Sequence, residues 1–348
     1  MRDDGGDLVK DDLVRETLRR RILALIDRLA DGSRDDQARD ELLADLVAWQ
    51  ERHIPAFARL RRARPHAALP TDVFRHARVA SHPPKQDVRL FRSSGTTSGA
   101  RSTHAFRDLS LYDAAARSWA RTLFFAQAPR RMVALVPPET EAPDSSLSYM
   151  IARFGDWFGE LHHAWQGGRL APDLLEAALS RDEPVTLLGT SFAFVFADEV
   201  ASRRFQLPEG SCIMQTGGFK GRTRTLGPAQ MLTLLEERYG VPPERVVAEY
   251  SMTELSSQAW ETSLVEPQGP RRLRFPGWVR VSLVDPETLE PTTGEGLLRI
   301  DDAANLDSVC AIQTSDLARL DGDGVTLLGR APGAVPRGCS LAIEEALP

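Results

Sequence analysis

The sequence predicts an α/β protein: a mostly parallel sheet flanked by helices, followed by a small antiparallel β subdomain near the C-terminus. Between about residues 86 and 274, short apolar runs alternate with amphipathic helical segments, which is typical of parallel strands joined by helices. From residue 275, apolar and polar residues alternate with a period of two around a Pro- and Gly-containing turn, which indicates antiparallel strands. The composition, 42% apolar and 26% charged over 348 residues, is that of an ordinary globular protein with a core.

The N-terminal region, residues 1–85, is predicted to be mainly helical. Apolar residues such as Ile26 and Leu29 recur at helical spacing, so we expect two helices, broken near the DGSRDD stretch at residues 31–36. The Pro-containing segment 65–85 is expected to be a connector with at most one short strand.

The central segment, residues 86–274, is predicted to hold the parallel sheet, and residues 275–348 the antiparallel strands. The expected strands of the central segment are residues 131–137, 184–189, 211–218 and 245–251, and its expected helices are residues 173–180, 192–202 and 228–240. Residues 278–300 are expected to form two strands around a turn.

Charge and cysteine content exclude some classes of protein. A formal charge of −6 and a pI near 5.7 argue against a general nucleic-acid binder. Three widely spaced cysteines, Cys212, Cys310 and Cys339, form no disulfide framework and no metal cluster, so a reducing cytoplasm fits best. The longest apolar run, residues 185–197, is shorter than the roughly 20 residues that span a bilayer. We therefore expect a cytoplasmic protein that is not an integral membrane protein.

The stretch SSGTTSG, residues 93–99, follows an apolar strand end. Its hydroxyl-bearing residues, which surround the glycines Gly95 and Gly99, are Ser93, Ser94, Thr96, Thr97 and Ser98. Glycine-rich turns expose backbone N–H groups that bind anions. A Walker A loop is excluded because it requires a lysine, and Arg101 stands near that position instead. The stretch is therefore either a phosphate-binding loop or a mobile surface turn.

Three acidic or basic residues follow predicted strands further along. Glu254, with Thr253, stands where a strand is expected to pass into a helix; it suits an Mg²⁺ ligand, or it is a first-turn residue favoured by the helix dipole. Asp316 and Arg330 each follow an expected strand. An aspartate in such a loop accepts two ribose hydroxyls, or it forms an Asx-turn.

Taken in order, these pieces resemble the adenylate-forming superfamily of acyl-CoA synthetases, peptide-synthetase adenylation domains and firefly luciferase. The matching stretches are SSGTTSG (93–99), TGGFKGR (216–222), EYSMTE (249–254), TSDLARL (314–320) and the terminal LLGRAPGAVPRGCSLAIEEAL. Within that superfamily the chain looks most like the acyl-protein synthetase of bacterial bioluminescence. FRSSGTTSGARSTHAFRDLSLY, GTSFAF and GRAPGAVPRGCSLAIEE carry this likeness.

The resemblance implies the fold of the superfamily's N-terminal domain and the activation of a carboxylic acid, here a fatty acid, by ATP and Mg²⁺. Residues 93–99 would bind phosphate, and magnesium would be bound by Thr253 and Glu254. Adenine would be bound by Thr216, Gly217 and Gly218, and the nucleoside as a whole by Tyr250 and Asp316. Arg330 would contact the ribose or a phosphate. Phe192, Phe194 and Gly217 would line the acyl pocket. At spacing two on a helix the phenylalanines cannot all share one face, so at least one belongs to the core.

The sequence departs from the superfamily at three places. The phosphate loop ends in Ala100-Arg101 rather than a lysine, and Ser315 replaces the usual glycine of the ribose motif. The chain also stops where the superfamily's mobile, lysine-bearing C-terminal domain begins, so we expect that domain to be absent. The acyl-protein synthetase likeness implies that Cys339 accepts the acyl group in place of coenzyme A, for delivery to a partner reductase. Arg337 is close to Cys339 in sequence, and a nearby cation lowers the pKa of a thiol. The alternative is that Cys339 is a buried structural cysteine.

Two other functions remain open. The adenylate of an aromatic or other acid could pass to an external acceptor or reductase in a natural-product pathway, which makes Cys339 dispensable. Alternatively, the chain could be a non-catalytic nucleotide- or acyl-binding scaffold. His104, His162 and His163 are candidate contacts to the substrate carboxylate, each with the alternative of an ordinary surface or core histidine.

Overall fold

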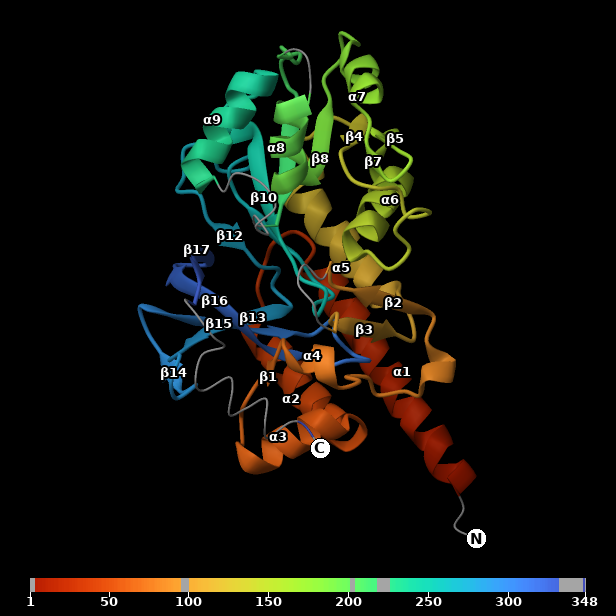
Figure 1. Ribbon diagram of the computed structural model, residues 1–348. Helices are drawn as coiled ribbons and strands as arrows, with labels where there is room; N and C mark the ends of the chain where they lie inside the picture. The colour runs from red at the N-terminus through yellow and green to blue at the C-terminus, as the bar shows by residue number, and fades with distance from the viewer. Residues whose placement is uncertain (1–3, 95–99, 201–203, 218–225, 332–346, 348) are drawn as a thin grey trace. The chain divides into compact units, whose positions relative to one another are not determined.

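A computed structural model of the protein describes residues 4–94, 100–200, 204–217, 226–331 and 347 (Figure 1). The chain divides into two units. Unit 1 comprises residues 1–118, 253–257 and 275–348, and unit 2 comprises residues 119–252 and 258–274.

Unit 2 is built on a sheet whose strand order is β12-β11-β10-β9-β8-β4-β5. Its strands are β4 (Met132–Ala134), β5 (Leu161–His163), β8 (Thr186–Thr190), β9 (Cys212–Thr216), β10 (Val246–Tyr250), β11 (Ala259–Glu261) and β12 (Leu273–Arg274). The five strands from β10 to β5 are parallel, whereas β11 and β12 are antiparallel. The predicted parallel sheet is therefore confirmed, with its four expected strands present as β4, β8, β9 and β10.

Helices cover this sheet because its strands are apolar on both faces. They are η2 (Arg121–Phe125), α6 (Ser146–Phe158), α7 (Pro172–Leu179), α8 (Ser191–Val200), α9 (Pro228–Tyr239) and η3 (Pro243–Arg245), and a short hairpin is formed by β6 (Trp165–Gln166) and β7 (Arg169–Leu170). The expected helices are confirmed as α7, α8 and α9. Figure 1 shows α8 and α9 beside strands β8 and β10.

The core of unit 2 follows from strand alternation. Val133, Leu187, Ile213 and Val246 are partners across neighbouring strands or in register with them, so their side chains share one face. All four are fully buried in a cluster with apolar residues of α7, α8 and α9. This packing holds the ends of β8, β9 and β10 at fixed positions.

Unit 1 contains an antiparallel sheet of strand order β14-β13-β15-β16-β17. Its strands are β13 (Val279–Val284), β14 (Pro291–Thr292), β15 (Glu295–Asp302), β16 (Ala311–Asp321) and β17 (Gly324–Arg330). Each neighbouring pair is antiparallel, which confirms the prediction for this part of the chain. The connector supplies β1 (Leu69–Pro70), which pairs in parallel with β16.

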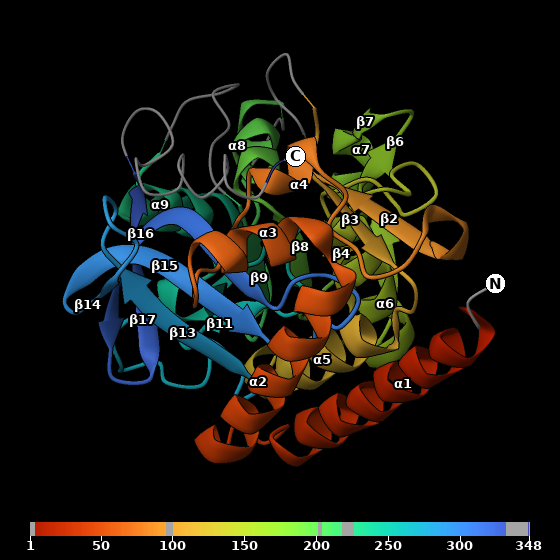
Figure 2. The ribbon, with the colours of Figure 1, turned by 90° about the horizontal axis from the view of Figure 1, so that it is seen from below.

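The N-terminal region forms three longer helices where two were expected. They are α1 (Asp4–Arg28), α2 (Asp36–His53) and α3 (Pro55–Ala63), followed by α4 (Val73–His76), η1 (Pro84–Gln86) and α5 (Ser110–Ala120), which continues into unit 2. The additional break falls at Pro55, since proline cannot donate to a preceding turn but suits the first position of a new helix. Helices α1 and α2 lie side by side (Figure 2), with Arg21 Nη1 2.7 Å from Asp45 Oδ2.

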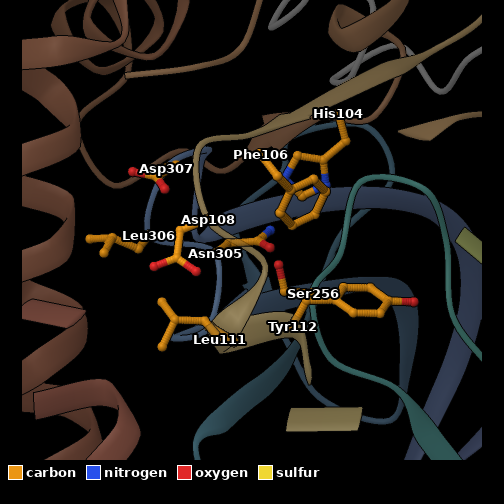
Figure 3. Close-up of a pocket in the computed structure, with 10 residues that line it drawn as sticks. His104, Phe106, Asp108, Leu111, Tyr112, Ser256, Asn305, Leu306 and Asp307 are labelled. Carbon is orange, nitrogen blue, oxygen red and sulfur yellow. The ribbon is translucent and has the colours of Figure 1, made fainter. Parts of the chain in front are cut away.

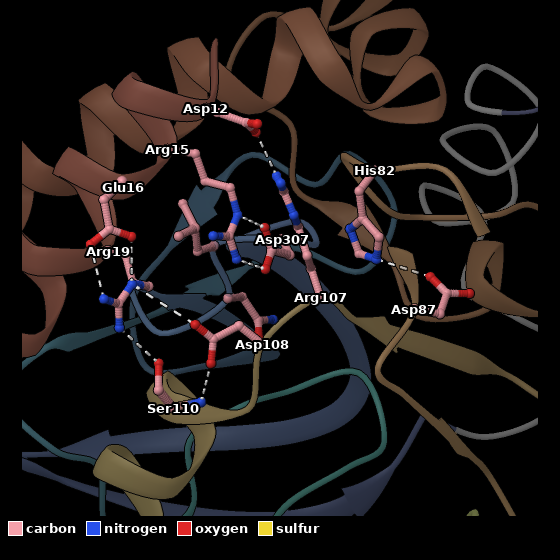
Figure 4. Close-up of polar contacts among 12 residues, drawn as sticks. Asp12, Arg15, Glu16, Arg19, His82, Asp87, Arg107, Asp108, Ser110 and Asp307 are labelled. Atoms are coloured by element: carbon pink, nitrogen blue, oxygen red, sulfur yellow. Dashed lines mark hydrogen bonds and ion pairs between the residues drawn. The ribbon is translucent and has the colours of Figure 1, made fainter. Parts of the chain in front are cut away.

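Ion pairs attach α1 to segments distant in sequence within unit 1. Arg15 donates from two nitrogens to the carboxylate of Asp307, and both side chains are buried. Arg107 Nη1 donates to Asp12 Oδ1 at 2.8 Å (Figure 4). Residues 1–85 and 275–348, treated as separate regions in the sequence, therefore share one unit.

Among the helices that the structure describes, none combines the length and the apolarity needed to cross a bilayer.

Candidate functional site

The serine- and glycine-rich stretch connects the two strands of a β-hairpin in unit 1. The hairpin pairs β2 (Arg89–Arg92) with β3 (Thr103–Phe106) in antiparallel register. Ser93 and Ser102 pair at the end of the strands next to the connecting stretch, which is called the hairpin base below. Ser93 N donates to Ser102 O, and Ser102 N donates to Ser93 Oγ, each at 3.0 Å. Ser94 is exposed. Gly95, Thr96, Thr97, Ser98 and Gly99 lie outside the described residues.

The segment after β10 does not form the helix that the sequence predicts. Thr253 and Glu254 form a turn, and no helix follows. The backbone N–H groups of Ser256 and Ser257 donate to Asp302 Oδ2 at 3.0 and 2.8 Å, so a carboxylate 45 residues away in sequence takes the donors that a helix would use. The reading of Glu254 as a first-turn helix residue is therefore wrong.

This turn contacts the base of the hairpin. His104 Nδ1 donates to the carbonyl oxygen of Thr253 at 2.9 Å, and the Ser102 hydroxyl is hydrogen-bonded to the Glu254 carboxyl. Asn305 Nδ2 donates to the carbonyl oxygen of Glu254 at 2.9 Å. His104, Asn305 and Ser256 also line one cavity of about 10 Å³ (Figure 3), which is about the space one water molecule needs.

Burial controls the charge of these groups. Glu254 is 6% exposed, and burial raises the pKa of its carboxyl, while the hydrogen bond from Ser102 acts in the opposite direction. Burial lowers the pKa of His104 to about 4. At neutral pH a neutral imidazole therefore donates to Thr253, and the carbonyl of the turn is held without adding a positive charge beside Glu254.

In unit 2, the carboxyl ends of parallel strands bring three predicted residues to one edge. Thr216 is in register with Thr190 on β8 and with Glu249 on β10. Gly217 follows with a φ of +74°, which glycine adopts without strain, and Ser191 Oγ donates to its carbonyl oxygen at 2.9 Å. Tyr250, the last residue of β10, lies at the same edge. Gly218 lies outside the described residues.

Sequence reasoning missed Glu249. The Thr216 hydroxyl donates to its Oε2 atom, and the Ser251 side chain is also hydrogen-bonded to this carboxyl. Burial raises the pKa of this carboxyl to about 7. The signal in the sequence was a charged residue inside the apolar run VVAEY, where period-two alternation places Glu249 on the same face as Val247.

Glu249 is expected to make stability depend on pH. Between the ordinary value of 4.5 and about 7, the folded chain keeps a proton that the unfolded chain has released, so the free energy of unfolding falls as pH rises. The change over this window is up to about 3 kcal/mol. Urea denaturation of Glu249→Gln and wild type at pH 4.5, 6, 7 and 8 should show a stability difference that shifts in favour of the variant as pH rises.

A matched control is Glu237→Gln, on the exposed surface of α9. Its stability should follow that of the wild type at every pH. If the free energies of unfolding of wild type and Glu249→Gln change with pH in parallel, the folded chain does not keep a proton on Glu249 in this range.

Asp316 and Arg330 lie opposite each other in unit 1. Asp316 was expected in a loop after a strand, and this is wrong: β16 continues to Asp321, and Asp316 pairs with Arg330, the last residue of β17. Arg330 Nε is 3.4 Å from Asp316 Oδ1, and the arginine side chain is 74% exposed. The strand persists because β17 supplies hydrogen-bond partners, with a register shift between Leu317 and Ala318.

The phenylalanines of α8 divide between core and surface. Phe194 is fully buried and lies edge-on to Tyr239, with ring centres 6.0 Å apart. Phe192 is 36% exposed, and its ring is parallel to that of Phe196. Phe194 is thus the core residue that the spacing requires, and Phe192 remains the better candidate for a pocket.

Both cysteines in the described part of the chain are buried. Cys212 and Cys310 are fully buried, and burial raises the pKa of the Cys212 thiol to about 11 and that of Cys310 as well. Both therefore stay protonated, as expected of structural cysteines. Cys339 lies outside the described residues.

No group of three or more His, Cys, Asp or Glu residues in the described part of the chain could hold a metal ion. A single carboxylate with a neighbouring hydroxyl, as at Glu254 and Ser102, suits Mg²⁺ that arrives with a nucleotide, because Mg²⁺ keeps waters and phosphate oxygens as its other ligands. The residues present therefore fit a nucleotide-borne Mg²⁺ better than a resident metal.

Comparison with known proteins extends these observations. No protein-family model matches the sequence, and no curated protein matches it. Among solved structures, ATP-bound MatB from Rhodopseudomonas palustris is similar, with a TM-score of 0.52 and 14% identity over 72% of this chain and 49% of that one. The long-chain-fatty-acid-CoA ligase FadD1 from Archaeoglobus fulgidus has a TM-score of 0.51 and 12% identity over 70% of this chain and 51% of that one.

The o-succinylbenzoate CoA synthetase MenE from Bacillus subtilis is similar to the same degree, with a TM-score of 0.51 and 17% identity over 70% of this chain and 49% of that one. The chain thus spans about half the length of the solved structures it matches. At this level of identity the likeness shows the fold alone. It confirms the predicted fold class, an α/β fold with a mostly parallel sheet flanked by helices and with antiparallel strands.

Proposed function

We propose that this chain binds ATP and activates a carboxylic acid as an acyl-adenylate, with release of pyrophosphate. The observation that carries the proposal is the contact between the hairpin base and the turn in unit 1. His104 and Thr253 are 149 residues apart in sequence and 2.9 Å apart through Nδ1 and O, and Ser102 is hydrogen-bonded to Glu254. Ser93 and Ser102, which flank the hydroxyl-rich stretch, are therefore linked to a carboxylate suited to Mg²⁺.

The reaction needs positive charge because two anions must meet. A carboxylate oxygen of the acid would form a bond to the α-phosphorus of ATP, and the bond from that phosphorus to its bridging oxygen would break, releasing pyrophosphate. Ser93 and Ser94 would donate to phosphate oxygens. Glu254, with Thr253, would hold the Mg²⁺ that accompanies ATP, which supplies neutralisation of the phosphate charge.

The remaining predicted residues would bind the nucleoside. In unit 2 we assign a role in adenine binding to Thr216, Gly217 and Tyr250, and in unit 1 a role in ribose binding to Asp316 and Arg330. The ion pair between the last two supports a shared role, since the arginine orients the aspartate carboxylate. Phe192 would contact the acyl chain.

The acceptor that we propose is the thiol of Cys339, with a fatty acid as substrate. Cys212 and Cys310 are buried and protonated, so Cys339 is the cysteine left for this role. The thiolate would attack the acyl carbon, the bond to the adenylate oxygen would break, and AMP would leave. The acyl group would then pass to a partner protein or reductase.

Exchange of radiolabelled pyrophosphate into ATP tests the activation step directly. The full chain is incubated with Mg²⁺, ATP and one acid at a time from a panel of fatty and aromatic acids. Exchange that depends on one class of acid supports the proposal and identifies the substrate. Binding of ATP without exchange for any acid would instead favour the non-catalytic scaffold.

Intact-protein mass spectrometry tests the acceptor. Wild type incubated with ATP, Mg²⁺ and the acid that supports exchange is expected to gain one acyl group that hydroxylamine removes, whereas Cys339→Ser should gain none. The neighbouring Ser340→Ala is the matched control and should be acylated like the wild type. Exchange in Cys339→Ser with no adduct in any variant would assign the acyl group to an external acceptor.

A further inference from the structure

A groove of about 280 Å³ lies in unit 1 beside the base of the β2–β3 hairpin. Its basic lining residues are Arg75 and His76 of α4, Arg78, and Arg101 of the hairpin, with the hydroxyl of Thr103 beside them. Among the described residues that line it, none is acidic, although the chain as a whole has a formal charge of −6. The groove therefore suits an anion.

The arginines of the groove are held in position by groups that do not line it. Arg78 donates to Asp87 Oδ2 and to the carbonyl oxygen of His82, each at 3.0 Å; Figure 4 shows His82 in turn bonded to Asp87. Arg75 Nη1 is 3.3 Å from Asp72 Oδ1. Guanidinium groups oriented in advance lose little side-chain entropy when a ligand binds.

The groove shares Arg101 with the base of the hairpin. Arg101 donates to the carbonyl oxygens of Ser93 and Arg92, so its guanidinium is attached to the hairpin base. Arg75 is 49% exposed, and its charge acts on the buried Glu254 carboxyl. Planar guanidinium groups bind phosphate through paired hydrogen bonds.

We infer that this groove binds the β- and γ-phosphates of ATP and the pyrophosphate formed from them, with Arg75 and Arg101 donating hydrogen bonds to the phosphate oxygens. The inference rests on the proposed function and adds to it a binding site for the leaving group. No residue of α4 lies in a stretch that resembles the superfamily's motifs, and Arg101 stands near the position of the usual lysine.

Equilibrium binding of three probes tests the inference: pyrophosphate, ATP with Mg²⁺, and AMP, each titrated into the full chain. Arg75→Gln and Arg101→Gln are expected to weaken pyrophosphate and ATP by about 10- to 100-fold, the loss typical of a charge-assisted hydrogen bond. AMP lacks the β- and γ-phosphates, so its Kd should not change. Arg75→Lys keeps the charge and should recover part of the affinity.

The matched control is Arg62→Gln, an exposed arginine of α3 whose Nε donates to a backbone carbonyl of its own helix. It should leave all three affinities unchanged, because a general charge effect would act at Arg62 as well. Unchanged affinities for pyrophosphate and ATP in Arg75→Gln and Arg101→Gln would overturn the inference. Coenzyme A serves as a fourth probe: if these variants weaken only the binding of coenzyme A, the inference is also overturned, and the groove is assigned to an acceptor.

The two proposals fail in different ways. Normal pyrophosphate exchange in Arg75→Gln and Arg101→Gln, with an unchanged KM for pyrophosphate, would overturn the groove and leave adenylation standing. Loss of pyrophosphate affinity in these variants, in a chain whose wild type exchanges pyrophosphate with no acid, would support the groove and refute the activity.

Discussion

Glu254→Gln is expected to lower the kcat of acid-dependent ATP–pyrophosphate exchange by about 100-fold or more. Glutamine keeps the size of the side chain and an oxygen for Ser102, but it removes the negative charge that would hold Mg²⁺. Because burial raises the pKa of this carboxyl, a neutral amide suits the site in the absence of Mg²⁺. The folded chain should therefore lose activity without losing stability, as urea denaturation would verify.

The control for this prediction is again Glu237→Gln, which should exchange pyrophosphate at the wild-type rate. Titration with Mg²⁺ provides a second readout, since Glu254→Gln should need a higher Mg²⁺ concentration for half-maximal exchange. A variant that exchanges normally at all Mg²⁺ concentrations would remove Glu254 from the reaction and weaken the argument from the hairpin–turn contact.

Asp302→Asn is expected to have the largest effect on stability, about 3 kcal/mol. Asp302 is fully buried, and all its partners are donors: Ser256 N, Ser257 N and Oγ, and Ala304 N, at 2.7 to 3.0 Å. An asparagine offers one acceptor oxygen, so its amide nitrogen would face at least one backbone N–H. Urea denaturation at pH 7 measures the loss.

The matched control is Asp285→Asn, because Asp285 accepts similar bonds from Glu287 N and Thr288 N in an exposed turn. Water can replace those bonds, so the change should cost less than about 1 kcal/mol. Equal losses at the two positions would show that burial does not set the effect. Because Asp302 binds the 253–257 segment to the rest of unit 1, the variant should also lower exchange through Glu254.

The strands of the parallel sheet were predictable because their signal is local. The runs that became β4, β8, β9 and β10 are apolar over several consecutive residues, and only a strand buried on both faces explains that pattern together with the helices between them. The positions of Phe192 and Phe194 on α8 were predictable in part, since helical spacing alone places them on different faces.

Local signals failed where a distant residue takes over the hydrogen bonds. Thr253 and Glu254 were expected to start a helix, but Asp302 accepts hydrogen bonds from the backbone N–H groups of Ser256 and Ser257 that follow them. Asp316 was expected in a loop, but β17 pairs with it and extends the strand. Glu249 escaped notice because its partner, Thr216, is brought beside it only by the register of β9 and β10.

The amino-acid order alone was enough to predict the fold class and to single out the hydroxyl-rich stretch, Thr253 with Glu254, and Asp316 with Arg330, because residue type and spacing carry that information. Only the tertiary structure brought Ser102 to Glu254 and gathered Arg75, Arg78 and Arg101 around one groove. Contacts between residues so far apart in sequence depend on how helices and strands pack, which no local pattern encodes.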